Sequence, residues 1–160
     1  MGIRYYAYPV HSDDIARARA DPLAFVSDDP FSDAWGPEEL RPTMLYLDKC
    51  WHYLQVVLRP RSDGAPRTSF GLVEGQVTHT DRGWIPFVKL LAPDDVAAIA
   101  DDLALVDGDD VRIALGLDLT EIDEPSQLVE YDYVLQYLAD ARAFLAELVK
   151  HRQGMVYMIG

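Results

Sequence analysis

The sequence contains one cysteine, Cys50, among its 160 residues. Without a second cysteine no disulfide can form within this sequence, so nothing indicates an oxidising compartment. Long hydrophobic runs are also missing, because no segment approaches the roughly 18 apolar residues of a membrane-spanning helix. The opening MGIRYYAYPV lacks the long apolar region of a signal peptide. From these absences we expect a soluble, cytoplasmic protein without a targeting segment.

Basic residues are scarce. The sequence has 14 lysines and arginines but 27 aspartates and glutamates, which gives a formal net charge of -13 at pH 7. Such a charge repels phosphate backbones and anionic lipid surfaces, so nucleic acids and membranes are poor partners. It attracts a cation or a basic protein partner. The alternative is that the acidic side chains are simply solvated and keep the protein in solution.

The short motifs of common catalytic sites are absent as well. The sequence has no Gly-x-Gly-x-x-Gly string, no P-loop and no Gly-x-Ser-x-Gly elbow. Its four histidines form no His-x-x-x-His pair, and no Cys-x-x-Cys pair occurs, although zinc sites use such spacings. We therefore expect no cofactor and no metal, and a non-enzymatic role is favoured. The alternative is a metal site in which folding gathers His52, His79 and an acidic residue.

What the sequence does contain is a series of helix and strand patterns. Residues 3–9, IRYYAYP, form an aromatic and alternating stretch that predicts a strand. Three-four spacing of apolar residues predicts a long helix over residues 126–150. Further strands are predicted at 69–79, 83–91 and 155–159, further helices at 12–20, 48–58, 93–103 and 109–115, and a turn-rich loop at 59–67. This order predicts one α+β domain over residues 1–160, with a small mixed sheet that includes both terminal strands.

Residues 27–43 form a long connection between these elements. The segment SDDPFSDAWGPEELRPT contains three prolines, has no clear period and carries Phe31 and Trp35. Such a long connection is uncommon inside a compact domain and is often a lid, a binding loop or an arm. The alternative is a loop that its two aromatic side chains pin onto the core.

The segment LDKCWHYL, residues 47–54, gathers chemically versatile side chains at the start of a predicted helix. We expect Asp48 to cap this helix, Trp51 and Leu54 to enter the core, Cys50 to be shielded and His52 to face solvent. The alternative is a ligand site, since Asp48 and His52 are four residues apart on one helix face and a carboxylate orients an imidazole. Its candidate residues are Asp48, Trp51, His52 and Trp84, whose rings would line a pocket.

Several stretches, taken in order, resemble the YfbM-like family of uncharacterised bacterial proteins, domain of unknown function 1877. They are MGIRYYAYPV, LDKCWHYLQVVL, VEGQV, LAPDDVAAIADDL and GMVYMI, and the most specific match is Leu47, Asp48, Lys49 and Trp51 in a Leu-Asp-Lys-x-Trp pattern. The resemblance implies a single α+β domain in the bacterial cytoplasm. It supplies no catalytic residues.

The leading hypothesis is a non-enzymatic binding or interaction protein. Its acidic surface and segment 27–43 would receive a basic protein partner, for example as an antidote to a basic toxin. The first alternative is an enzyme or small-ligand-binding protein that uses the Asp48 and His52 region. The second is a plain structural domain, and the oligomeric state stays open.

Overall fold

The computed structural model describes residues 2–59, 65–117 and 125–160, so residues 60–64 of the predicted loop lie outside it. The strands are β1 (Tyr5–Val10), β2 (Leu45–Asp48), β3 (Thr78–Thr80), β4 (Gly83–Ile85), β5 (Phe87–Leu91) and β6 (Gly154–Ile159). The α-helices are α1 (Ile15–Ala20), α2 (Pro30–Trp35), α3 (Cys50–Val57), α4 (Pro93–Leu103), α5 (Gly108–Leu115) and α6 (Pro125–Lys150). Short 3-10 helices are η1 (Ser12–Asp14), η2 (Pro22–Phe25), η3 (Glu38–Leu40) and η4 (Thr68–Leu72).

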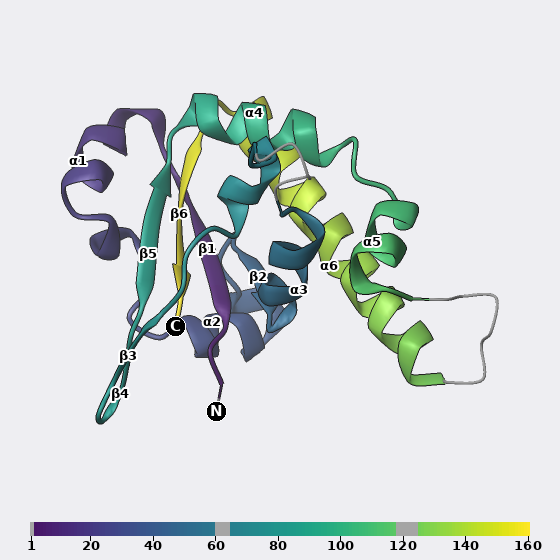
Figure 1. The fold of residues 1–160 in the computed structure, drawn as a ribbon. Coiled ribbons are helices and arrows are strands. Elements are labelled where there is room, and N and C mark those ends of the chain that lie inside the picture. Colours follow the sequence, from purple (N-terminus) through teal and green to yellow (C-terminus); the bar gives the residue numbers. More distant parts are fainter. Residues whose placement is uncertain (1, 60–64, 118–124) are drawn as a thin grey trace.

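The main sheet places both terminal strands at its centre, as Figure 1 shows. Its strand order is β2-β1-β6-β5, and every neighbouring pair is antiparallel. Strands β1 and β6 pair along their whole length, from Tyr5 opposite Ile159 to Val10 opposite Gly154. The predicted α+β class and the shared sheet of the terminal strands are therefore confirmed. Strands β3 and β4 form a separate hairpin.

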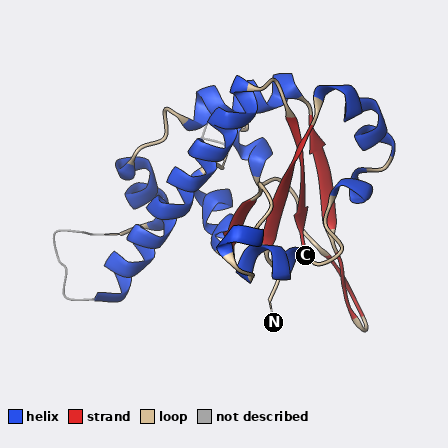
Figure 2. Cartoon of the chain, turned by 180° about the vertical axis from the view of Figure 1, so that it is seen from behind, coloured by secondary structure: helices blue, strands red, loops and turns tan. Residues whose placement is uncertain are grey.

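Both faces of the sheet are covered. Because successive side chains of a strand point to opposite sides, one strand contributes to the packing on both faces. On β1, Tyr5 and Ala7 join the main core beneath α3, α4 and α6, whereas Tyr6 and Tyr8 join a smaller cluster on the other face. Figure 2 shows the helices arranged around the sheet. We call the face beneath α3, α4 and α6 the inner face and the opposite one the outer face.

The long helix α6 supplies much of the inner core, and its predicted apolar stripe is confirmed. Buried positions recur at three-four spacing along it, namely Val134, Leu138, Ala141, Leu145 and Leu148. Helix α4, predicted over residues 93–103, adds the buried side chains of Val96, Ile99 and Leu103. Among the described residues, no helix is long and apolar enough to cross a membrane.

Three predicted elements differ from the structure. The predicted strand 83–91 divides at Pro86 into β4 of the hairpin and β5 of the main sheet. Leu47 and Asp48 end strand β2 instead of starting a helix, and α3 begins at Cys50. The predicted strand 69–79 contains η4, with strand pairing only from Thr78 onward. The backbone carbonyls of this segment accept hydrogen bonds from side chains. The Tyr5 hydroxyl donates to Leu72, and the Tyr157 hydroxyl donates to Gly71 and Glu74. Together with Gln55 Nε2, which donates to the carbonyls of Val73 and Gly75, these hydroxyls take the place of a neighbouring strand.

Residues 27–43, which we call the arm, cross the outer face and contain α2 and η3. The arm is attached to the sheet, but the two aromatic residues do not enter the core, because Phe31 is 47% and Trp35 is 62% exposed. Instead Ala34 is buried against Tyr6 and Tyr8. The hydroxyl of Tyr8 also donates to Oδ2 of Asp33 at 2.8 Å. Ala34, the Tyr8–Asp33 hydrogen bond and a hydrogen bond from Trp35 to the Tyr46 hydroxyl attach the arm.

Candidate functional site

The Asp48 carboxylate joins three distant parts of the chain. Its Oδ1 accepts hydrogen bonds from Arg4 Nε at 3.0 Å and from the Tyr46 hydroxyl at 2.9 Å, and its Oδ2 accepts from the Tyr133 hydroxyl at 3.0 Å. The Tyr46 hydroxyl in turn accepts from Trp35 Nε1 at 3.0 Å. One carboxylate therefore connects the chain start, the arm and α6. We call this group the Asp48 cluster.

The backbone of Asp48 has an uncommon conformation. Its φ is 46°, in the left-handed region that only glycine and, less often, asparagine and aspartate adopt readily. This conformation forms the sharp turn between β2 and α3. The predicted capping role is wrong, because Lys49 holds the N-cap position of α3 and no side chain caps that helix. The carboxylate is instead engaged by Arg4, Tyr46 and Tyr133.

The ionisation of the cluster follows from these contacts. Burial acts to raise the pKa of the Asp48 carboxyl, but the hydrogen bonds from Tyr46, Tyr133, the Lys49 backbone and Arg4 outweigh it, so the pKa lies below its usual value. Burial raises the pKa of Tyr46 to about 12, and burial and the nearby carboxylate raise the pKa of Tyr133. At neutral pH the carboxylate is charged and both tyrosines are donors.

A groove of about 830 Å³ runs beside this cluster, between β2 and α6. Residues of the arm and β2 form one wall, including Thr43, Met44, Leu45 and Tyr46. The other wall is a single face of α6, on which the lining residues include Tyr133, Tyr137, Asp140, Phe144 and Glu147. Because Tyr46 and Tyr133 both line the groove and both bind Asp48, the Asp48 cluster closes one end of it.

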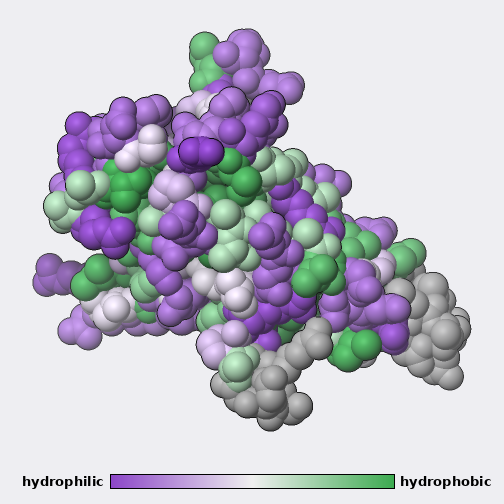
Figure 3. All heavy atoms as spheres, turned by 90° about the horizontal axis from the view of Figure 1, so that it is seen from above, coloured by the Kyte–Doolittle hydropathy of each residue, from purple (hydrophilic) through white to green (hydrophobic). Residues whose placement is uncertain are grey.

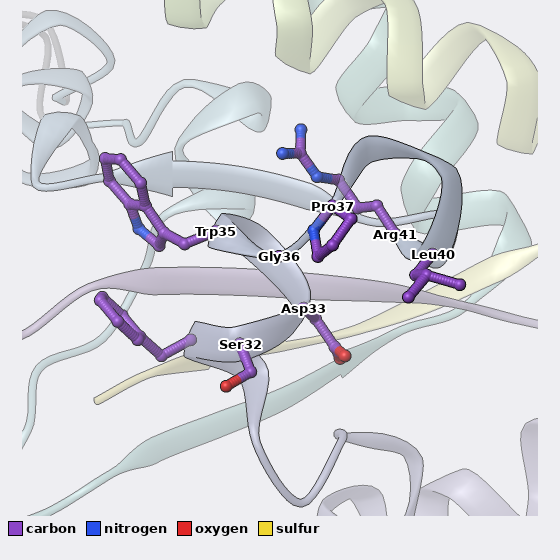
Figure 4. A pocket seen from close by; sticks show the side chains of 8 residues that line it. Ser32, Asp33, Trp35, Gly36, Pro37, Leu40 and Arg41 are labelled. Carbon is purple, nitrogen blue, oxygen red and sulfur yellow. The ribbon is translucent and has the colours of Figure 1, made fainter.

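Two further pockets continue this groove. One of about 510 Å³ lies on the arm, and Figure 4 shows Trp35, Pro37, Leu40 and Arg41 around it. It shares Arg41 with the groove. The other, of about 430 Å³, shares Thr43, Phe144 and Glu147 with the groove and extends it toward His151. The groove thus adjoins the arm pocket at Arg41 and the third pocket at Thr43, Phe144 and Glu147.

The walls of the groove favour a cationic group. Three tyrosine rings line it, and ring faces attract ammonium and guanidinium groups. Its carboxylates are Asp140, which accepts a hydrogen bond from Gln136, and Glu147, whose contacts with Lys150 and His151 are 3.6 Å long and exposed. Exposed ion pairs of this kind contribute little to the free energy of folding. Arg41 is the basic residue that lines it.

The arm pocket has a different character. Its exposed apolar side chains are Phe31, Trp35 and Leu40, of which Leu40 is 77% exposed. The face of the molecule that Figure 3 shows from above differs from this pocket, because hydrophilic side chains interrupt its hydrophobic areas. The arm pocket is therefore apolar, whereas the groove beside α6 is acidic and lined by tyrosines.

A model of the family described as Domain of unknown function (DUF1877) matches residues 1–158 of the chain. The chain belongs to this family. The crystal structure of YfbM, a protein of unknown function from Escherichia coli, is similar over 99% of this chain and 100% of that one, with a TM-score of 0.55 and 18% sequence identity. At that identity the likeness shows the fold alone. No curated protein matches the chain.

In this DUF1877 domain the four predicted ligand-site residues lie in different places. Asp48 borders the groove through its tyrosine partners, whereas Trp51 is 6% exposed and belongs to the inner core. His52 lies on the exposed side of α3, and no hydrogen bond or ion pair joins it to Asp48 among the described residues. Trp84 is 40% exposed on the β3–β4 hairpin. The neighbours Trp51 and His52 have a ring contact, but in the part of the chain that the structure describes no contact joins all four residues.

The alternative metal site can be examined in the same way. His52 is on α3 and His79 is on β3, opposite Trp84. Within residues 2–59, 65–117 and 125–160, no group of three histidine, cysteine or acidic side chains is arranged to hold a metal ion. Cys50 is buried, as predicted, and burial raises the pKa of its thiol to about 12. A thiol in this state is a poor nucleophile.

Sequence reasoning missed the α6 wall of the groove and the residues Arg4 and Tyr46. The wall had a signal, because Tyr133, Tyr137, Asp140, Phe144 and Glu147 recur at three-four spacing next to the buried stripe of α6. A second stripe that carries tyrosines and carboxylates indicates a partly exposed helix face. Arg4 and Tyr46 had no comparable signal, since only the sheet brings them to Asp48.

Proposed function

We propose that this protein binds a basic segment of a protein partner in the groove between β2 and α6. The observation that carries the proposal is the wall of α6, where Tyr133 and Tyr137 stand beside the carboxylates of Asp140 and Glu147. Arginine and lysine side chains are attracted to both ring faces and carboxylates. A role as an antidote to a basic toxin is one concrete form of this function.

The charge of the arm supports the proposal. Residues 27–43 contain five acidic residues and one basic residue, Arg41. Asp28, Asp29, Glu38 and Glu39 are exposed. Together with the formal net charge of -13, this excess would steer a basic partner toward the groove before contact.

The ionisation of the Asp48 cluster also supports binding rather than acid–base catalysis. A general acid or base works best with a pKa near the operating pH. The pKa of Asp48 is lowered and that of Tyr46 is raised to about 12, so neither group changes protonation near neutral pH. A carboxylate that stays charged near neutral pH and is held by fixed donors suits a structural support for the groove.

The proposal can be tested with a fluorescein-labelled peptide of alternating arginine and leucine. A length of about nine residues, ~30 Å at ~3.3 Å per residue, is more than enough to span the groove. We expect fluorescence anisotropy to detect binding that weakens steeply from 0.1 M to 1 M salt, as the screening length falls from about 10 to about 3 Å. A peptide of equal length with glutamate in place of arginine should not bind.

Two charge reversals on α6 locate the site. Asp140→Lys puts a positive charge into the groove wall and should weaken binding about tenfold or more. Asp132→Lys makes the same charge change at an exposed position of α6 that does not line the groove, so its effect should be small. Equal effects of the two variants would indicate non-specific attraction and would contradict the proposal.

A further inference from the structure

The groove lies against a free edge of the main sheet. Strand β2 is the last strand of the order β2-β1-β6-β5, so only β1 pairs with it. Among the described residues, Leu45–Asp48 makes backbone hydrogen bonds only within the sheet. An edge strand presents every second N–H and C=O outward, where another strand can pair with them.

The lining of the groove shows that it meets this edge. Met44, Leu45 and Tyr46 are consecutive and all line it. Consecutive side chains of a strand point to opposite faces, so a groove on one face would be lined by alternate residues only. Leu45 lines the groove although it is 2% exposed, as expected where the groove borders backbone at the edge.

The groove has room for an extended segment. Its lining on α6 extends from Tyr133 to Glu147, which is about 21 Å at 1.5 Å per residue. An extended chain of about six residues covers that distance. The direction of β2 is also fixed, because Asp48 binds Tyr133 at one end and Thr43 shares a pocket with Glu147 at the other. The free edge therefore follows the groove.

The opposite edge of the sheet is less suitable. Beside β5, Phe25 of η2 packs with Val88 and Leu90. The pocket that includes Lys89 and Leu91 holds about 200 Å³, against about 830 Å³ for the groove at β2. The β5 edge thus serves as an internal control for any experiment on the β2 edge.

From this geometry, and resting on the proposed function, we infer that the basic segment binds as a fifth strand, paired with the free edge of β2. Its alternate side chains point to the two faces of the sheet. Those on the inner face meet Tyr137, Asp140 and Glu147 of α6, which suit basic groups. Those on the outer face meet the arm, where Trp35 and Leu40 suit apolar groups. The partner segment is therefore extended and alternates basic with apolar residues.

Backbone methylation of the alternating arginine and leucine peptide tests the pairing. In a strand, the N–H groups of the arginines point to one edge and those of the leucines to the other. We expect N-methylation of one of the two sets to weaken binding about tenfold or more, because hydrogen bonds to β2 are lost. Methylation of the other set should change binding less than about twofold, because those groups face away from β2. Equal effects of the two sets, whether small or large, overturn the strand pairing.

Hydrogen exchange of the whole protein gives a second measurement. The unmethylated peptide should slow exchange of outward amides in β2 and leave the edge amides of β5 unchanged. Protection that is absent from β2 overturns the inference. Binding that Asp140→Lys weakens but that lacks this protection would retain the proposed function and defeat only the strand pairing. Binding with equal sensitivity to Asp140→Lys and Asp132→Lys would defeat both.

Discussion

The two faces of the sheet are built on different principles. On the inner face, Tyr5, Ala7 and Tyr157 lie beneath long helices in one continuous apolar core. On the outer face, Tyr6 and Tyr8 lie beneath the short elements of the arm, which hydrogen bonds help to hold in place. The comparison indicates that the inner face provides most of the stability. The border of the outer face, where arm and α6 leave a groove, is available for binding.

The largest effect is expected on the inner face. Trp51 is 6% exposed in the main core, so Trp51→Ala should lower the free energy of unfolding by about 3–5 kcal/mol through lost burial and a cavity. Urea unfolding followed by far-UV circular dichroism measures this change. A loss below about 1 kcal/mol would mean that the inner face is not the main source of stability.

An intermediate effect is expected at the boundary between the faces. Asparagine tolerates the left-handed backbone of residue 48, so Asp48→Asn tests the charge without adding strain. The substitution removes the charge that pairs with Arg4 and replaces one acceptor oxygen with an NH₂ group, so at least one of the three side-chain hydrogen bonds is lost. This change should cost about 1–3 kcal/mol at pH 7.

The pH dependence of this variant sharpens the test. Because folding lowers the pKa of Asp48, its carboxylate stabilises the fold above the unfolded value of about 3.9. That stability is lost as the pH falls through the lower, folded value. The difference between Asp48→Asn and the original protein should therefore shrink in urea titrations below about pH 4. A difference that is independent of pH would show that the charge of Asp48 does not act in this way.

A smaller effect is expected on the outer face. Tyr8→Phe removes the hydroxyl that donates to Asp33 and should cost about 0.5–1.5 kcal/mol. In hydrogen exchange, amides of α2 should exchange faster in this variant, while those of β6 change little. Equal acceleration in α2 and β6 would show that the arm does not open independently of the inner core.

The smallest effect is expected at His52, which is exposed on α3. His52→Ala should change the free energy of unfolding by less than about 0.5 kcal/mol, as do most surface substitutions. It should also leave peptide binding unchanged. If the variant abolishes binding or an activity while its melting curve stays the same, the Asp48 and His52 region becomes the functional site instead of the groove.

The same contrast explains what the sequence could predict. Inner-face elements such as α4 and α6 follow from local periodicity, since Val96, Ile99 and Leu103 or Val134 and Leu138 repeat at helical spacing. Strand β2 has only four residues, and its pairing with β1 is not visible locally. The role of Asp48 was missed because its partners lie up to 85 residues away. Polar contacts between distant segments leave no periodic pattern.

The proposed binding site is the groove between β2 and α6. The most direct test is a titration of the ¹⁵N-labelled protein with the alternating arginine and leucine peptide, followed by amide chemical shifts. We predict that the largest shifts occur in residues 43–48 and on the groove face of α6 from Tyr133 to Glu147. Largest shifts at α4 and α5, whose first turns are also acidic, would contradict it.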